Sequence, residues 1–200
     1  MRAGQTLRAS DGHEVALFPM EMMYVWQGWG PNAWTHCCSY SLDLTSGPSP
    51  VTTPVYAPAT CVLVAATSLA LQWHTVEPVW TPSGLKYLSW TTVHHDTQVH
   101  SVGSIVNQGQ LMTYTGNNQA GGVNHCHIDF GEGQGQGLYP ACICPGGQAY
   151  AMTNAIVPEK AVFVNDTRLM STFGLQWQEW SGPQGFNLEV KNGLIIRAWR

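Results

Sequence analysis

The chain is built from short apolar runs separated by Gly, Pro, Ser and Thr, and this pattern constrains the fold more than any other feature. Residues 86–95 (KYLSWTTVHH) form a β-branched and aromatic run, and residues 54–68 (PVYAPATCVLVAATS) contain two short strand patterns about a turn at Pro58. Long amphipathic helices are hard to find. We therefore predict a mainly β protein, an antiparallel β-sheet or barrel-sandwich hybrid with short connecting loops.

Charge and hydropathy narrow the classes of partner. Only 10% of the 200 residues are charged, the net charge is −4, and the eight Lys and Arg residues form no basic stripe, which argues against nucleic acid. A neutral or polymeric polar substrate fits this surface better.

No stretch approaches the ~20 consecutive apolar residues that span a bilayer, so no integral membrane segment is expected. Residues 1–14 lack the apolar core of a signal peptide, so we expect another route if the protein works outside a cytoplasm.

The tripeptide His125-Cys126-His127 is the main indication of chemistry. Side chains at i and i+2 of a strand leave the same face, so His125 and His127 project into one space. A hydrolytic zinc site needs three protein ligands and an open position for water. His36 and Asp43 are suitable further ligands. Their separation of seven prevents them from sharing one strand face, so His36 is expected in the turn before the strand that carries Asp43.

These residues lie within a longer ordered pattern. The pattern consists of His36, Ser41-Leu42-Asp43-Leu44, Pro54-Val55-Tyr56-Ala57-Pro58, His94, Val102-Gly103-Ser104-Ile105-Val106-Asn107-Gln108-Gly109-Gln110 and His125-Cys126-His127. In its order and in its spacing from His94 to His127, this pattern resembles the lysostaphin-type zinc endopeptidases of bacterial peptidoglycan, LytM-like metallopeptidases with the duplicated hybrid motif fold. The resemblance covers roughly residues 15–130. It departs from the commonest members in having six residues, rather than three, between His36 and Asp43.

The resemblance implies a role for each of these polar residues. His36, Asp43 and His127 correspond to the zinc ligands, and His125 corresponds to a catalytic histidine beside the metal. His94 or His95 corresponds to the second catalytic histidine, because adjacent strand residues face opposite ways and a slip of one residue would exchange them. The spacing to Gly103 favours His94, whereas the pair His95-Asp96 resembles another variant of the family.

The implied function is hydrolysis of peptide bonds in peptidoglycan stem peptides or cross-bridges. The implied protein is a zinc metallo-endopeptidase that acts outside the cell, at the cell wall or on a virion, in the manner of a phage lysin, with phage tail or virion proteins as further partners. The alternative is a non-catalytic cell-wall-binding or virion structural module of the same fold. Retention of all the polar positions of the pattern favours the enzyme. Lipoyl and biotinyl carriers share this architecture, but they need a modifiable Lys at a hairpin tip, and no Lys lies between residues 87 and 159.

The remaining predictions concern domains and cysteines. We expect a metallopeptidase domain at residues 1–150 and a C-terminal extension at residues 151–200 that packs on it. The Gly-rich segment 131–148 is interpreted as a flexible connection.

The cysteines allow several interpretations. Cys37-Cys38 and Cys142-x-Cys144 are compatible with metal ligands, disulfides or buried apolar residues. Burial is expected for most of the six cysteines, and Cys37 and Cys38 are expected to be non-ligands.

Overall fold

The computed structural model describes residues 1–200 except 48, 136, 164–167, 170–186, 192–193 and 200. The mainly β prediction is confirmed, since strands dominate and the described helix, α1 (Pro158–Ala161), has a single turn. The strands of the main sheet are β1 (Met22–Gln27), β2 (Leu42–Thr45), β4 (Cys61–Ala66), β5 (Ala70–Thr75), β8 (Leu88–Val93), β9 (Ile105–Val106), β11 (Cys126–Glu132), β14 (Ala155–Ile156) and β15 (Arg168–Leu169). The paired strands outside it are β3 (Pro54–Tyr56) with β10 (Leu111–Tyr114), β6 (Val79–Thr81) with β7 (Gly84–Lys86), β12 (Leu138–Cys144) with β13 (Gly147–Met152), and β16 (Asn187–Lys191) with β17 (Leu194–Trp199).

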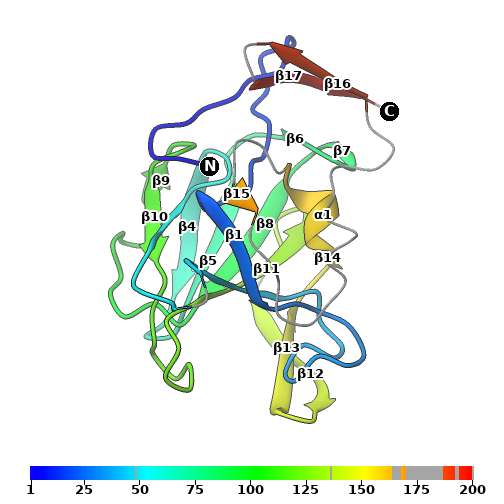
Figure 1. The fold of residues 1–200 in the computed structure, drawn as a ribbon. Helices are drawn as coiled ribbons and strands as arrows, with labels where there is room; N and C mark the ends of the chain where they lie inside the picture. Colours follow the sequence, from blue (N-terminus) through cyan, green and yellow to red (C-terminus); the bar gives the residue numbers. More distant parts are fainter. Residues whose placement is uncertain (48, 136, 164–167, 170–186, 192–193, 200) are drawn as a thin grey trace.

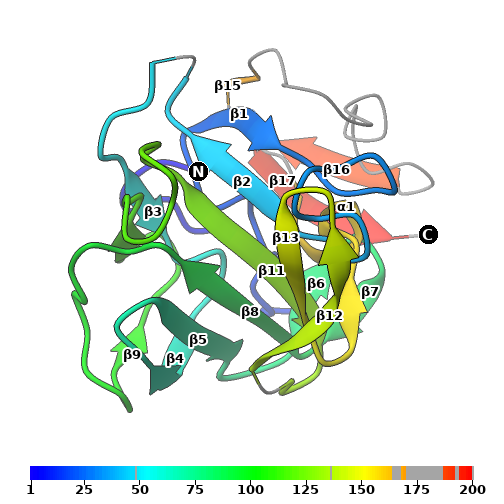
Figure 2. The same cartoon turned by 90° about the horizontal axis from the view of Figure 1, so that it is seen from below.

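The main sheet follows the order β15-β1-β2-β11-β8-β5-β4-β9, and β14 also pairs with β11. Its central strands β2, β11, β8 and β5 pair antiparallel and lie side by side in Figure 2. None of the described helices has the length and apolar character that a bilayer crossing requires.

One face of the central strands packs into the core, and the other face carries polar groups. Leu42 and Leu44 of β2, and Cys126, Ile128 and Phe130 of β11, belong to a buried apolar cluster that also contains Trp73 and Trp90. Because strand side chains alternate, the intervening Asp43, His127 and Asp129 emerge on the opposite face. The alternation seen in the sequence therefore fixes the orientation of the polar residues relative to the core.

The segment 131–148 corrects a prediction. It was expected to be a flexible connection, but residues 138–152 form the β12–β13 hairpin, which projects from the lower end of the molecule in Figure 1. Glycines and Pro140 obscured the strand pattern in the sequence. The register shifts between Pro140 and Cys142, and a bulge is one of the places where a strand accommodates proline.

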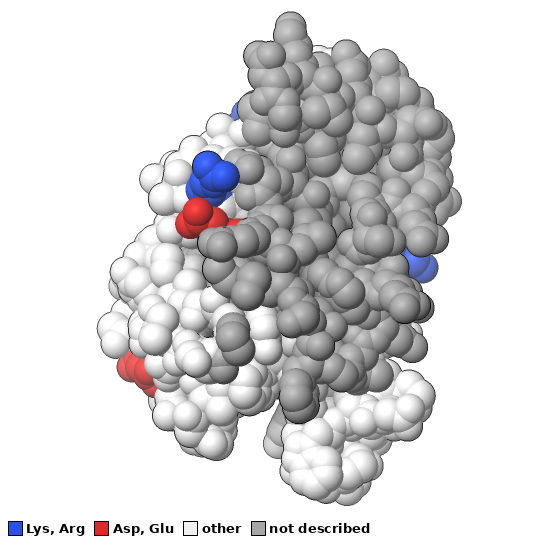
Figure 3. Space-filling model, viewed as in Figure 1, with Lys and Arg blue, Asp and Glu red and all other residues white. Residues whose placement is uncertain are grey.

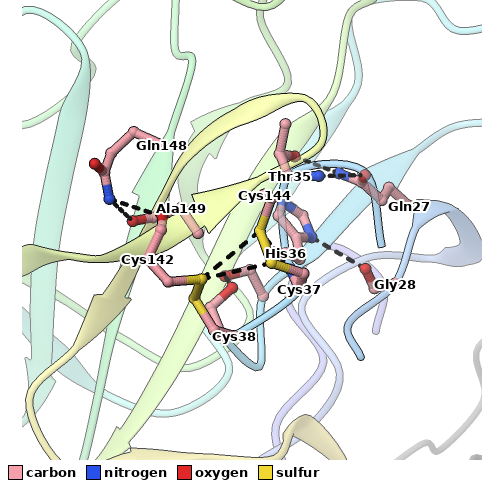
Figure 4. The surroundings of a disulfide bond; sticks show 12 residues. Gln27, Gly28, Thr35, His36, Cys37, Cys38, Cys142, Cys144, Gln148 and Ala149 are labelled. Atoms are coloured by element: carbon pink, nitrogen blue, oxygen red, sulfur yellow. Dashed lines mark hydrogen bonds between the residues drawn. A yellow bond between two sulfur atoms is a disulfide. The ribbon is translucent and has the colours of Figure 1, made fainter. Parts of the chain in front are cut away.

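The same hairpin is tied to the loop that follows His36. Disulfides join Cys37 to Cys144 and Cys38 to Cys142, so four of the six cysteines are paired rather than acting as the isolated buried residues that we expected for most of them. Cys61 and Cys126 are free and buried, as expected. Figure 4 shows the two disulfides beside one another, next to His36.

The predicted division at residue 150 stays a prediction. β13 runs across this position, and β14, in the predicted extension, pairs with β11 of the main sheet. Phe163 is fully buried and forms a bridge to Leu17. Much of the remaining extension lies outside the described residues.

The cysteine arrangement predicts a simple thiol count. In native protein purified in air, Cys61 and Cys126 should resist a thiol reagent, because they are 0% and 1% exposed and burial raises the pKa of both thiols. Denaturation without reductant should expose these two thiols, and reduction should release the other four. Four or more reactive thiols in denatured, unreduced protein would contradict the disulfide assignment.

Candidate metal centre

The pairing of β2 with β11 brings two of the predicted ligands together. In this register His127 lies directly opposite Asp43, and on its other side His127 lies opposite Val93, the last residue of β8. His36 comes from the loop before β2, as the spacing predicted. The structure therefore brings His36, Asp43 and His127 to one point on the polar face of the sheet.

Three potential ligand atoms converge at this point. His36 Nε2 lies 3.1 Å from His127 Nδ1, and Asp43 Oδ1 lies 3.4 Å from His36 Nε2 and 3.2 Å from His127 Nδ1. A tetrahedral zinc ion with bonds of about 2.0–2.1 Å would separate its ligand atoms by about 3.3 Å. The three separations fit such an ion without rearrangement.

The outer contacts of the two imidazoles direct their other nitrogens inward. His36 Nδ1 lies 3.2 Å from the Gly28 carbonyl, and His127 Nε2 lies 2.7 Å from Asp129 Oδ2. When these outer nitrogens donate, both inner nitrogens of the neutral rings present lone pairs to each other and to the carboxylate. Three acceptors facing one another in a buried site repel unless a cation lies between them.

The electrostatics also favour positive charge at this point. Burial opposes the charged imidazole of His127, but Asp129 and Asp43 outweigh burial and raise its pKa to about 10. Burial likewise opposes ionisation of Asp43, yet His36, His127 and His125 hold the pKa of its carboxyl well below its usual range. Burial lowers the pKa of His36. A proton or a metal ion can supply the required charge, and the donor set of two imidazoles and one carboxylate suits zinc.

Further side chains hold the carboxylates in place. Gln27 Nε2 donates to Asp43 Oδ2 at 3.0 Å, which leaves Oδ1 buried and without a hydrogen-bond partner among the described residues. Ser41 Oγ donates to Asp129 Oδ1 at 2.6 Å, and Asp129 is 1% exposed. Sequence reasoning missed Asp129 and Gln27. Asp129 had a detectable signal, because it continues the alternation of His125 and His127 along the same face.

His125 and His94 lie beside the three converging atoms. Nδ1 of His125 is 2.9 Å from the Val123 carbonyl, and Nδ1 of His94 is 2.8 Å from the Asn118 carbonyl. The two ring centroids are 4.6 Å apart, and the His94 ring lies 6.0 Å from that of His127. Burial lowers the pKa of His94 to about 4, so at neutral pH this ring is uncharged. When Nδ1 of either ring donates to its carbonyl, Nε2 of the neutral form of that ring carries the lone pair.

The backbone separates His94 from its neighbour His95. His94 follows the last residue of β8 and has a φ of 72°, an uncommon conformation for a residue other than glycine. Gly116 leaves room for it, because a Cβ there would collide with the His94 carbonyl oxygen. The His95 ring is buried and interacts with the backbone of Leu69 and Thr67. The structure thus brings His94, rather than His95, to the other histidines, and its catalytic role stays a prediction.

Comparisons with known proteins find a phage morphogenesis protein and several peptidases that are similar to this chain. No protein-family model matches the chain. Morphogenesis protein 1 of Bacillus phage B103 is 27% identical over 177 residues, which are 86% of this chain and 46% of that protein. The chain therefore spans about half the length of this curated relative.

The similar solved structures include three peptidases. The antimicrobial peptidase lysostaphin of Staphylococcus simulans is 18% identical, with a TM-score of 0.41 over 62% of this chain and 49% of that one. The M23 metalloprotease pseudoalterin, from the deep sea, is 20% identical, with a TM-score of 0.44 over 93% of this chain and 96% of that one. A zinc-containing peptidase of Vibrio cholerae is 12% identical, with a TM-score of 0.40 over 72% and 44%.

The contact between Asp129 and His127 predicts a measurable effect on metal binding. Asp129→Asn should weaken zinc affinity about 10–100-fold. An amide orients the His127 ring less firmly than the carboxylate does, and it raises the basicity of the ligating nitrogen less. Competition with a fluorescent chelator measures this affinity. Asp11→Asn, which changes an exposed carboxylate bound to the Trp80 indole, is the matched control and should leave the affinity unchanged. Equal zinc affinities for the two variants would show that Asp129 does not support metal binding.

Proposed function

We propose that the chain is a zinc metallo-endopeptidase that hydrolyses peptide bonds in the stem peptides or cross-bridges of bacterial peptidoglycan. The observation that carries this proposal is the convergence of His36, Asp43 and His127 on one point, with the imidazoles of His125 and His94 beside it. A buried structural site would be closed by a fourth protein ligand, whereas three ligands leave one position for reacting groups.

Each of the five polar residues is assigned a separate role in hydrolysis. His36, Asp43 and His127 would hold the ion, which supplies a Lewis acid for the scissile carbonyl and for water. His125 lies beside the ligands, with Nε2 3.5 Å from Asp43 Oδ1, and we assign it the transfer of the proton from the attacking water. His94 is neutral and lies next to His125, so we assign it the orientation of water and the stabilisation of charge that develops on the carbonyl oxygen.

The proposed substrate and location are supported by the motif pattern, by a relative and by the surface charge. The motif pattern resembles peptidoglycan endopeptidases, and the curated relative is named as a phage morphogenesis protein. In Figure 3 the described Lys and Arg side chains on this face are isolated rather than gathered into a basic patch, which agrees with a neutral or polar polymer as substrate better than with nucleic acid. We therefore place the protein outside the cytoplasm, at the cell wall or within a phage particle.

Digestion of purified peptidoglycan tests the function. The protein should release fragments with one new amino group and one new carboxyl group per cut, as identified by mass spectrometry, and a chelator should abolish the release until zinc is restored. Sacculi from species with different cross-bridges would identify the bond. Binding to the sacculi without any release of fragments would instead support the non-catalytic module.

Two histidine variants separate ligand from catalyst. His127→Ala should lose zinc and activity together, whereas His125→Ala should retain zinc and lose about 10²–10⁴-fold in turnover, the usual contribution of a general acid or base. Zinc per chain and the rate of sacculus digestion are measured on the same preparations, with His13→Ala as a histidine control outside the site. Full zinc retention by folded His127→Ala protein would refute the ligand assignment.

A further inference from the structure

The two disulfides form a single cluster rather than two separate links. All four sulfur atoms lie within 4.8 Å of one another, and beyond the bonded pairs Cys37 Sγ is 3.5 Å from Cys142 Sγ, while Cys142 Sγ is 4.0 Å from Cys144 Sγ. Figure 4 shows the sulfurs gathered between the loop after His36 and strand β12. The cluster is distinct from the three-ligand site, which contains no sulfur.

As two cross-links, the arrangement is redundant. A disulfide stabilises a fold largely by closing a loop in the unfolded chain, and the stabilisation grows with loop length. The bond between Cys38 and Cys142 spans 104 residues. Once it is made, the second bond closes only a short ring, because Cys37 is adjacent to Cys38 and Cys144 lies two residues from Cys142. The second bond therefore adds little to the first.

As four thiolates, the same arrangement resembles a metal site. A tetrahedral zinc ion with Zn–S bonds of about 2.3 Å separates its sulfurs by about 3.8 Å, between the two non-bonded distances observed. Cys142 and Cys144 leave the same face of β12 and provide two ligands from a rigid strand. The backbone N–H of Cys37 donates to Cys144 Sγ at 3.0 Å, a contact that is stronger with a thiolate.

We propose that, in the reduced chain, Cys37, Cys38, Cys142 and Cys144 bind one soft divalent ion such as Zn²⁺. Two molecules of a tertiary phosphine, each with one water, convert the two disulfides to four thiols. Each phosphine gives two electrons to one disulfide and becomes the phosphine oxide with the oxygen of the water, whose two protons go to the two released sulfurs. Binding of the ion then releases the four thiol protons to solvent. In either state the loop that carries His36 stays attached to the β12–β13 hairpin. A reducing compartment, in which disulfides rarely persist, would select the metal-bound state.

Metal content measures the proposal directly and independently of the proposed peptidase activity. The full chain, reduced with the phosphine under argon and dialysed against zinc, should hold two equivalents by mass spectrometry of the metal, against one for the oxidised chain. With cobalt, only the reduced chain should show the intense near-ultraviolet absorption of sulfur-to-metal charge transfer. Cys61 and Cys126 are thiols in both states, so the oxidised chain serves as the blank.

Two variants distinguish the sites and decide the outcome. Replacing both Cys142 and Cys144 by Ser should remove the charge-transfer band and one equivalent, whereas His127→Ala should keep the band and lose the other equivalent. Circular dichroism reports whether the reduced chain stays folded. Equal zinc content in the reduced and oxidised chains, a band that survives replacement of both Cys142 and Cys144, or unfolding of the reduced chain in excess zinc would each overturn the proposal.

Discussion

The antiparallel pairing of β2 with β11 is the interaction on which the site depends. This pairing sets Asp43 opposite His127. On its other edge β11 pairs with β8, and this second pairing places the end of β8 opposite His127 as well. A slip of one residue would turn Asp43 into the core and bring a leucine to the polar face. The buried side chains of Leu42, Leu44 and Ile128 resist that slip, so apolar packing on one face positions the candidate ligands on the other.

Residues outside the strands need other anchors. His36 lies in a loop, and the two disulfides at Cys37 and Cys38 attach that loop to the β12–β13 hairpin, while its Nδ1 contacts the Gly28 carbonyl. His94 lies just past β8 in a left-handed conformation, next to the glycine that leaves room for it. The rigid sheet thus positions Asp43 and His127, and covalent and steric restraints position His36 and His94. Fixed positions of this kind are what a preorganised site requires.

The sequence predicted the β class, and a period of two predicted that His125 and His127 share a face. The grouping of His36, Asp43 and His94 with them came from the resemblance to a known family. The choice between His94 and His95 was open, since alternation assumes a continuous strand and the strand ends at Val93. The hairpin was missed because glycines and Pro140 resemble a loop when its partner strand is unknown. The disulfides were missed for a related reason, because the pairing of residues about 105 apart depends on tertiary contacts that local patterns do not encode.

Zinc K-edge X-ray absorption of the oxidised chain loaded with one equivalent tests the central claim most directly. The account predicts a first shell of nitrogen and oxygen at about 2.0–2.1 Å, with imidazole scattering from two histidines and no sulfur. The imidazole contribution should fall in the His36→Ala variant if that protein still binds zinc. A sulfur shell at about 2.3 Å, or a shell of oxygen without imidazole, would contradict the assignment of His36, Asp43 and His127 as the metal centre.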